Sequence, residues 1–373
     1  MMKVMVYQGR PTGGGSKKSL FNFIKLLKND VFFTIVVGSK GWFYENLEEE
    51  KIDFYFFEEH KNIQNNRVVN SFFLRKIKSF FVIFFYGFKS LKFNYKLIKK
   101  EKIQIVILNE TRDLYFIGIP GLFNGCKIVS FLRGEPTIYD LPRLLLSHQI
   151  ISLSSKLINK LPNILKRKTT VIPNYIKIKD SILPVIKKDN PNIINLAWIG
   201  SIIPVKGMEN LVKIINLIRN EPFIVNIYGD IPSKDYKGYK EKILTLIEEL
   251  NLTDKFVFHG WKKDISIPIR QSDIVILTSK SEGLPRAILE SMSFSKPVMA
   301  FDVGGVSDLI FDNINGFLIP YGDIEGYAEK LKLLINNKEK REEFGKKSLE
   351  IAKNHFDEHI VKKKLLKVFS TIL

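Results

Sequence analysis

The side chains with the most informative spacing are two glutamates late in the chain. Glu282 and Glu290 are separated by seven residues, and Arg286 lies between them. Residues 273–279 form a short run rich in β-branched residues, which predicts a buried parallel strand. Pro285 suits the first position of a helix after this strand, because its missing N–H is no loss there. We therefore expect Glu282 in the loop between strand and helix, and Glu290 one to two turns inside the helix.

The start of that helix is a natural place to bind a phosphate. The first N–H groups of a helix have no partner within it, and they carry the positive end of the helix dipole. An anionic group is stabilised at such a helix end. The loop that carries Glu282 is therefore expected to lie beside a phosphate-binding position.

This arrangement resembles the glutamate pair of the retaining glycosyltransferases of family 4, also described as glycosyl transferases group 1. Residues 296–306 are similar to the family's G-x-P-V-V-A … G-G stretch, and residues 315–320 resemble its G-x-L-V-x-P stretch. A glutamate pair alone is a weak signal, whereas the ordered series across residues 273–323 is specific. The resemblance implies an α/β protein of two Rossmann-like, doubly wound parallel-sheet domains facing a cleft, the GT-B fold.

The resemblance also implies roles for individual residues. Glu290 would accept hydrogen bonds from the ribose hydroxyls of a nucleotide-diphosphate sugar, and Glu282 would face the donor sugar. Gly283 and Leu284 would offer backbone N–H groups to the same sugar. Gly229 matches the turn after the second strand of the donor domain.

The departing diphosphate needs positive charge. Lys206 follows the first strand of the second half, where the family's phosphate-binding lysine lies, and a surface lysine is the alternative. Ser201 stands where the family usually has an arginine, so Arg286 is the candidate for the missing cation. No two aspartates stand two positions apart, so the Asp-x-Asp metal motif of many transferases is absent. We expect no metal and no cofactor, with the nucleotide sugar as co-substrate.

The first half offers weaker site signals. Gly14 and Gly15 belong to a glycine-rich loop that resembles the family's P-x-G-G loop, and they are expected to approach the donor. The loop does not match the dinucleotide fingerprint. Arg133 and Glu135 follow a strand, at the edge where open α/β sheets bind ligands. They replace a histidine common in the family and are expected to contact the acceptor; an ordinary ion pair within the loop is the alternative.

Alternating strand and helix patterns predict two α/β domains. We expect an acceptor-binding domain over residues 1–178, a linker over 179–192 and a nucleotide-sugar-binding domain over 193–358. A final helix over 359–373 would cross back to the first domain. The expected strands are 3–7, 32–37, 53–57, 103–109, 127–133, 149–154 and 170–172 in the first half, and 195–200, 223–228, 255–258, 273–278, 297–301 and 316–319 in the second.

Charge is unevenly distributed along the 373 residues. Residues 1–200 hold 32 Lys and Arg against 15 Asp and Glu, whereas the whole chain holds 58 against 39. A basic first half suggests an anionic partner there. Residues 70–102 have apolar side chains at helical spacing flanked by lysines, which predicts a helix that either lies in an anionic membrane interface or packs on the first sheet.

The single cysteine, Cys126, excludes an internal disulfide and suggests a reducing compartment. No apolar run is long enough to span a membrane, and no secretory pattern opens the chain. We expect a cytoplasmic enzyme, peripheral on the inner face of the plasma membrane, that adds a sugar to a lipid-linked, lipopolysaccharide or capsular glycan acceptor. Nucleic-acid binding is disfavoured, because no recognition motif accompanies the charge.

Two other functions fit the same pattern. A sugar-nucleotide epimerase can use the same two-domain fold, and it would need no separate acceptor. A non-catalytic nucleotide-sugar-binding subunit is suggested by Ser201 and by the absent histidine.

Overall fold

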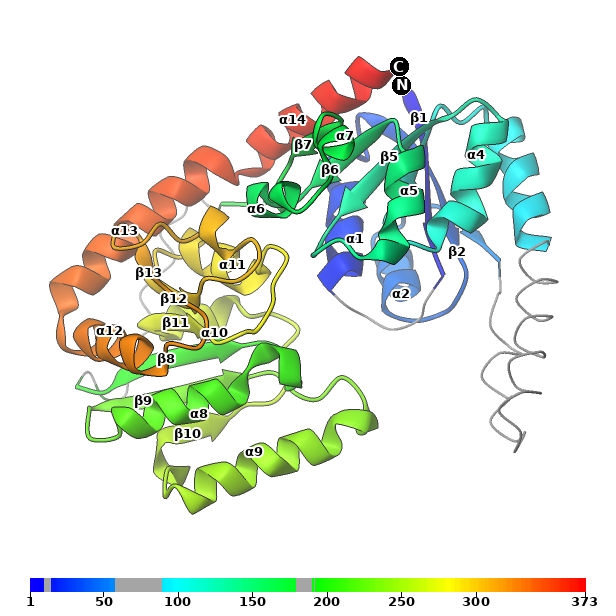
Figure 1. The fold of residues 1–373 in the computed structure, drawn as a ribbon. Helices are drawn as coiled ribbons and strands as arrows, with labels where there is room; N and C mark the ends of the chain where they lie inside the picture. Colours follow the sequence, from blue (N-terminus) through cyan, green and yellow to red (C-terminus); the bar gives the residue numbers. More distant parts are fainter. Residues whose placement is uncertain (10–14, 58–88, 179–189, 191) are drawn as a thin grey trace, which may run out of the picture. The chain divides into compact units, whose positions relative to one another are not determined.

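The chain folds into two compact units, each built on one parallel sheet (Figure 1). The computed structural model describes residues 1–9, 15–57, 89–178, 190 and 192–373. The first unit comprises Met1–Leu153, Ile158–Ile172 and Lys362–Leu373, and the second comprises Ser154–Leu157 and Pro173–Val361.

The first unit contains a seven-stranded sheet in the order β3-β2-β1-β4-β5-β6-β7. All neighbouring strands in it are parallel. The order of the strands reverses at β1, which lies between β2 and β4. In open α/β sheets, ligands bind at the carboxyl ends of the strands beside such a switch point. The strands are β1 (Met2–Gln8), β2 (Val31–Val37), β3 (Tyr55–Phe56), β4 (Ile105–Leu108), β5 (Lys127–Leu132), β6 (Gln149–Ser152) and β7 (Thr169–Val171).

Apolar side chains at helical spacing fix the helices of this unit against the sheet. In α1 (Gly15–Leu27), Leu20, Ile24 and Leu27 are fully buried, which is the stripe expected of a helix packed on a sheet. Further helices are α2 (Trp42–Glu49), α4 (Ile119–Phe123), α5 (Leu141–Leu146), α6 (Ser155–Asn159), whose first residues group with the second unit, and α7 (Asn163–Lys166).

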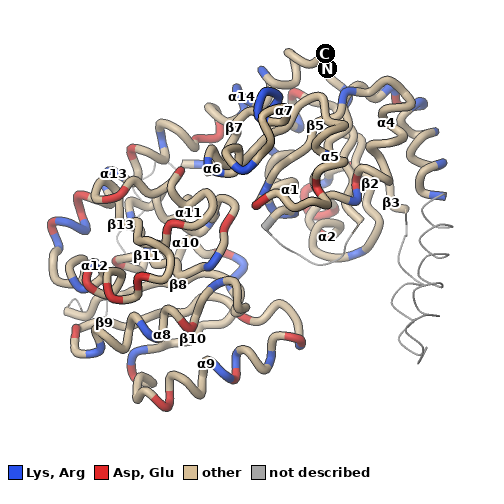
Figure 2. Tube along the Cα trace, viewed as in Figure 1, with Lys and Arg blue, Asp and Glu red and all other residues tan. Residues whose placement is uncertain are grey.

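Part of the lysine-flanked segment is a helix packed on this core. Residues 89–101 are helical, and Leu97 and Ile98 are buried in the cluster that includes Met5 and Val106. The lysines of this helix point to solvent and recur along it in Figure 2. At its carboxyl end the helix therefore packs on the sheet, as one of the two alternatives predicted. Residues 70–88 of the predicted segment lie outside the described residues.

The second unit contains a six-stranded parallel sheet in the order β10-β9-β8-β11-β12-β13. Here the order reverses at β8, which lies between β9 and β11. Both units thus confirm the α/β fold class and the doubly wound parallel sheets predicted from the sequence. The strands are β8 (Ile194–Ile199), β9 (Phe223–Tyr228), β10 (Phe256–Phe258), β11 (Ile274–Leu277), β12 (Val298–Phe301) and β13 (Gly316–Ile319).

The helices of the second unit form two sets of packing contacts, which meet where α12 contacts α13. One set joins α8 with α9 and α12, and the other joins α11 with α10 and α13. The last helix, α14, starts at the end of the second unit, and its residues from Lys362 onward group with the first unit. The bounds are α8 (Met208–Leu217), α9 (Lys237–Glu249), α10 (Ser266–Gln271), α11 (Arg286–Ser293), α12 (Ile324–Asn336), α13 (Lys338–His355) and α14 (Glu358–Ile372).

Within the first unit, the end of α14 is held by both packing and charge. Phe369 is fully buried, and its ring lies 6.0 Å from that of Phe23 on α1. Lys362 Nζ lies 2.7 Å from Asp30 Oδ2. Burial of a phenylalanine side chain stabilises a fold by about 1.5–3 kcal/mol, so the ring contributes more than the half-exposed ion pair.

Candidate functional site

The loops after β8 and β11 meet at the switch point of the second unit. Because these two strands are parallel neighbours, residues 200–207 and residues 278–284 lie at the same carboxyl edge. The backbone N–H of Lys280 donates to the Val205 carbonyl at 2.8 Å and ties the two loops together. This edge is where ligands bind in open α/β sheets.

An ion pair joins the two loops through side chains predicted to bind the donor. Lys206 Nζ lies 2.6 Å from Glu282 Oε1, and Ser279 Oγ donates to the same oxygen at 2.6 Å. The side chains of Lys206 and Glu282 are only 24% and 9% exposed, so the pair is not a solvated surface contact. An ammonium group has three N–H donors. One serves Glu282, and the others are available to phosphate oxygens.

The main chain at Lys206 is held against β11 by a specific turn. Gly207 has a φ of 66°, and a Cβ there would collide with the Thr278 carbonyl, so only glycine fits. Thr278 Oγ1 donates to the Lys206 carbonyl at 3.3 Å and accepts a hydrogen bond from Trp198 Nε1 at 3.2 Å. Trp198 is fully buried. The position of Lys206 is therefore set from the core.

The loop that carries Glu282 is fixed by a close approach of two main chains. Gly304 follows β12 with a φ of 54°, and a Cβ there would collide with the Glu282 carbonyl. The neighbouring Gly305 N–H donates to the same carbonyl at 3.4 Å. Gly304 and Gly305 thus allow the loop after β12 to pack directly on the loop of Glu282.

A second ion pair lies on α11. Arg286 Nη2 is 3.0 Å from Glu290 Oε1, one helical turn along, and the two side chains are 25% and 21% exposed. Arg286 Nη1 is buried and has no hydrogen-bond partner within the described part of the chain. The structure therefore joins two residues for which the sequence predicted separate roles. Arg286 orients Glu290 and still has a donor group available for an anion.

Leu284 is the one apolar side chain among the predicted donor-binding residues, and it is buried at 6% exposure. Its carbonyl accepts a hydrogen bond from Asn174 Nδ2 at 3.4 Å. This bond fixes the main chain beside Gly283 just before α11 begins.

Ser201 and Gly229 lie at the same carboxyl edge, after β8 and β9. The Ile202 N–H donates to the Asp230 carbonyl at 3.0 Å, which joins the segments that contain them. The second unit thus brings Lys206 and Glu282 into direct contact, joins Arg286 to Glu290, and places Ser201 and Gly229 on adjacent loops.

The candidate residues of the first unit do not pair with each other. Arg133 directly follows β5; its Nε donates to Asn109 Oδ1 at 2.5 Å, and its Nη1 donates to Ser19 Oγ. Glu135 pairs with Lys160 at 2.5 Å, and both of these side chains are close to half exposed. Burial lowers the pKa of the Arg133 guanidinium to about 9, with a smaller contribution from the charge of Arg143. The alternative of an Arg133–Glu135 ion pair is not formed in the described structure.

The two glycines predicted to approach the donor in the first half are Gly14 and Gly15. Gly14 lies outside the described residues. Gly15 is the first residue of α1. Their predicted contact with the donor stays a prediction.

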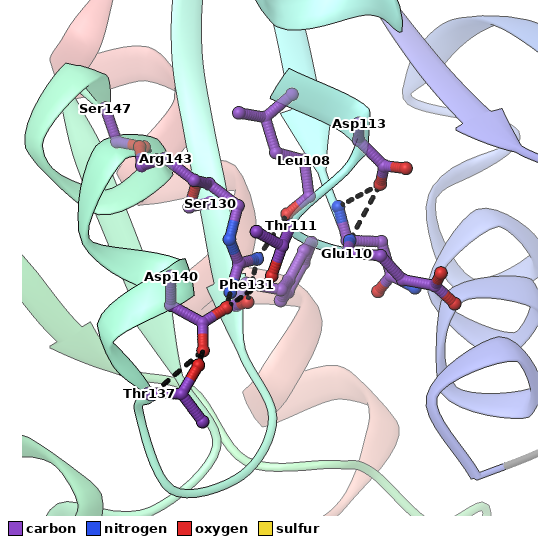
Figure 3. A network of polar contacts seen from close by, with 11 residues as sticks. Leu108, Glu110, Thr111, Asp113, Ser130, Phe131, Thr137, Asp140, Arg143 and Ser147 are labelled. Atoms are coloured by element: carbon purple, nitrogen blue, oxygen red, sulfur yellow. Dashed lines mark hydrogen bonds and ion pairs between the residues drawn. The ribbon is translucent and has the colours of Figure 1, made fainter. Parts of the chain in front are cut away.

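A polar network that the sequence analysis missed is centred on Arg143 and Asp140 (Figure 3). Arg143 is 4% exposed, and its Nη2 lies 2.9 Å from Asp140 Oδ1. Thr111 Oγ1 donates to the same oxygen at 2.7 Å, and Thr137 Oγ1 donates to Asp140 Oδ2 at 2.8 Å. The Thr137–Asp140 spacing is that of a capping box, a detectable signal. Nothing in the local sequence indicates that Arg143 is buried.

Asp113 closes the loop after β4 in the same region. Its Oδ2 accepts the backbone N–H groups of Asn109 and Glu110 at 2.8 and 2.7 Å (Figure 3). Complete burial raises the pKa of this carboxyl to about 7, although the two N–H groups act in the opposite direction. The bonds hold the loop that presents Asn109 and Arg112.

The described residues contain no cluster of three or more His, Cys, Asp or Glu side chains suited to a metal ion. Among the same residues, no helix has both the length and the hydropathy needed to cross a membrane.

Comparison with known proteins finds a family model that is similar to part of the second unit. Residues 183–350 match the family model of glycosyl transferases group 1. The second unit is therefore similar to a glycosyltransferase domain. The match includes Lys206, Glu282, Arg286 and Glu290, and therefore every ion pair described at this site.

Two curated relatives of this chain are named as sugar transferases. It is 31% identical over 179 residues to a poly(ribitol-phosphate) alpha-N-acetylglucosaminyltransferase of Staphylococcus aureus, covering 47% of this chain and 35% of that protein. It is 26% identical over 286 residues to the UDP-Gal:alpha-D-GlcNAc-diphosphoundecaprenol alpha-1,3-galactosyltransferase of Escherichia coli, covering 67% of this chain and 71% of that protein. The chain spans about half the length of the first curated relatives it matches.

Similarity to solved structures extends over both units. Anabaena HepE, solved in complex with UDP and glucose, matches 99% of this chain and 100% of its own with a TM-score of 0.80. Sequence identity is 20%. At this identity the match establishes the two-domain GT-B fold of the chain.

Proposed function

We propose that this protein is a retaining, metal-independent glycosyltransferase that uses a nucleotide-diphosphate sugar. The observation that supports the proposal most directly is the Lys206–Glu282–Ser279 cluster at the switch point of the second sheet. It lies within the segment that matches the glycosyl transferases group 1 family. Lys206 and Glu282 are both largely buried. In the proposal they lie beside the bond between the diphosphate and the sugar of the donor.

Departure of the diphosphate requires positive charge without a metal ion. Lys206 supplies one cation, whose remaining N–H groups can donate to phosphate oxygens. Arg286 supplies a second, since its buried Nη1 has no partner in the described structure. The start of α11 adds backbone N–H groups and the positive end of its dipole. We propose that these three replace the arginine absent at Ser201.

Glu282 positions the donor sugar in this proposal and does not act as a nucleophile. One of its carboxylate oxygens already carries two strong donors, Lys206 Nζ and Ser279 Oγ, which reduces its nucleophilicity. Retention of configuration then follows from attack on the same face of the sugar, with the departing phosphate taking the proton of the acceptor hydroxyl. Glu290, oriented by Arg286, accepts the ribose hydroxyls.

We propose a lipid-linked, lipopolysaccharide or capsular glycan as the acceptor, bound by the first unit at the cytoplasmic membrane face. Two relatives are named for poly(ribitol-phosphate) and for a diphosphoundecaprenol-linked sugar, which supports this class. The excess of basic residues in the first half and the exposed lysines of the 89–101 helix favour an anionic surface. Flotation with anionic liposomes tests the membrane part: binding should weaken as salt rises, and no binding at low salt would remove it.

Sugar transfer itself tests the proposal. The purified protein would be incubated with UDP-, GDP- and ADP-sugars and a short-chain lipid diphosphate sugar, with and without a chelator. We expect the enzyme to use one class of nucleotide sugar and to form the same amount of product with and without the chelator. The coupling constant of the anomeric proton in the product should show that the configuration is retained. Lys206→Ala should lose at least about 100-fold in kcat/KM, whereas Lys213→Ala, which removes a charge from the exposed side of α8, should not change it.

The two remaining functions give different results in the same experiment. An epimerase would convert the nucleotide sugar without any acceptor. A non-catalytic subunit would bind the nucleotide but release no product with any donor. Either result would replace the transferase proposal.

A further inference from the structure

Buried hydrogen-bond donors without acceptors gather at one edge of the first unit. Four side-chain nitrogens there are buried and have no hydrogen-bond partner within the described structure. Buried donors in folded proteins are almost always paired, and an unpaired one costs about 1–3 kcal/mol. Such a group therefore requires a physical explanation. The four atoms are Arg133 Nη2, Asn109 Nδ2, Arg112 Nε and Arg112 Nη2.

These donors stand at the switch point of the first sheet. Asn109 directly follows β4, and Arg133 directly follows β5, its parallel neighbour. The guanidinium of Arg112 reaches Gly9 at the end of β1, since its Nη2 lies 2.8 Å from where a Cβ of Gly9 would be. β1 and β4 are the two strands at which the order of the sheet reverses. Ligands bind at this position in open α/β sheets.

The side chains are held in place for a ligand. Asn109 is 6% exposed, its Oδ1 accepts the Arg133 Nε–H, and its Nδ2 has no hydrogen-bond partner within the described structure. The Arg133 guanidinium also lies over the Phe131 ring, 4.4 Å from its centroid. Asp113 fixes the backbone of the loop that carries Arg112. The arrangement is therefore built into the fold.

The charges at this edge are not balanced. Arg133 donates to a neutral amide and a hydroxyl, whereas the buried Arg143 has the carboxylate of Asp140. Arg112 Nε lies 3.4 Å from Glu110 Oε2, but the geometry does not make a hydrogen bond. Within the described residues, Arg133 thus has no carboxylate among its hydrogen-bond partners, whereas Arg112 lies near the carboxyl groups of Glu110 and Asp113. An added oxyanion would supply both the missing charge and the missing acceptors.

We propose that this edge of the first unit binds a phosphate group of the acceptor substrate, with Arg133, Asn109 and Arg112 as donors. The inference rests on the proposed transferase function for its substrate, but the site itself does not. A phosphate fits better than a carboxylate, because donors from three side chains, two after β4 and one after β5, suit a tetrahedral oxyanion. The site would select acceptors whose phosphate lies beside the accepting sugar or alcohol.

Calorimetry with inorganic phosphate tests the site without a donor or turnover. The titration would use the Lys206→Gln protein, so that the phosphate position of the second unit does not contribute. We expect saturable binding that Arg133→Gln weakens by about 10-fold or more. Arg167→Gln, which removes an exposed arginine from the same unit, should change the affinity less than about 2-fold. Acetate, the carboxylate probe, should bind more weakly than phosphate.

Thermal melting separates a ligand-binding arginine from a structural one. Without phosphate, Arg133→Gln should keep or raise the melting temperature, because a buried charge without a carboxylate is removed. With phosphate, only proteins that keep Arg133 should be stabilised. A lower melting temperature without any change in phosphate affinity would assign Arg133 to the fold and overturn the proposal. Acetate binding equal to or tighter than phosphate would overturn the choice of ligand.

Kinetics then tie the site to the acceptor. Arg133→Gln should raise the KM for a phosphate-containing acceptor and leave the KM for the nucleotide sugar unchanged. If phosphate binds as described but no nucleotide binds to the wild-type protein, the transferase proposal fails while the oxyanion site stands. If nucleotide sugars are used normally but phosphate does not bind, the oxyanion site fails alone.

Discussion

Lys206 Nζ and Glu282 Oε1 lie 2.6 Å apart although 76 residues separate them along the chain. Each side chain comes from a loop at the carboxyl end of a central strand, β8 for Lys206 and β11 for Glu282. The contact depends on two glycines, because Gly207 and Gly304 allow the loops to approach their neighbours. Lys206, the predicted phosphate-binding cation, and Glu282, the predicted sugar-binding carboxylate, are therefore directly coupled. Changing either side chain should affect binding of both the diphosphate and the sugar.

Glu282→Gln should lower the turnover of the nucleotide sugar for two reasons. It weakens the contact with the sugar, and it removes the charge that positions Lys206. The amide keeps the shape but loses the charge that holds the ammonium group, so Lys206 should become more mobile. We expect kcat/KM to fall by about 100-fold or more, and UDP itself to bind more weakly. A double-mutant cycle with Lys206→Gln measures the coupling. Strictly additive losses would show that the two side chains act independently.

Arg286 can contribute to donor binding in two ways, and a comparison of UDP with uridine separates them. If its Nη1 donates to the diphosphate, Arg286→Gln should weaken UDP binding and leave uridine binding nearly unchanged. If Arg286 only orients Glu290, UDP and uridine should lose affinity equally. Unchanged affinity for both, with normal turnover, would remove Arg286 from the site.

Glu290→Gln should lose discrimination for the ribose. A carboxylate accepts two hydroxyl groups more strongly than an amide does. The wild-type protein should therefore bind UDP more tightly than 2′-deoxy-UDP, and the variant should bind them about equally. An undiminished preference for the ribonucleotide in Glu290→Gln would place the ribose elsewhere.

Gly304→Ala should damage the site through the Glu282 loop. A Cβ at Gly304 collides with the Glu282 carbonyl, and the φ of 54° is unfavourable for alanine. Gly322→Ala is the matched control, because Gly322 also has a positive φ, 93°, but open space around it. We expect donor binding to be lost in Gly304→Ala and kept in Gly322→Ala, with melting curves recorded for both. If both variants lose donor binding equally, the positive φ, and not the contact with the Glu282 carbonyl, would explain the requirement for glycine at position 304.

Asp113 should make stability depend on pH. Burial raises its folded-state pKa from 3.8 to about 7, so between these values the folded state holds a proton that the unfolded state has lost. Stability from this group is therefore greatest below pH 4 and falls as the pH rises to about 7. Relative to wild type, Asp113→Asn should gain melting temperature as the pH is raised from 4 to 8. A constant difference across this range would contradict the raised pKa.

The strands of both sheets, and the helix start beside the proposed donor site, could be predicted from the sequence because their signals are local. Runs such as Ile274–Leu277 are apolar enough to predict a buried strand, and Pro285 marks the start of α11 within one residue. The Lys206–Glu282 contact could not be predicted, since it depends on two loops meeting at a switch point. For Arg133, the position at a strand end was predictable. Its neutral partners, Asn109 and Ser19, come from distant parts of the chain and were not.

The most direct test of the central claim is a thermal-shift panel with UDP, GDP, ADP and their common sugars. A ligand that binds only the folded state must raise its melting temperature. We predict stabilisation by one nucleotide class in the wild-type protein, and loss of that stabilisation in both Lys206→Ala and Glu290→Ala. No shift with any nucleotide, or an equal shift in the variants, would contradict a donor site at Lys206, Glu282 and Glu290.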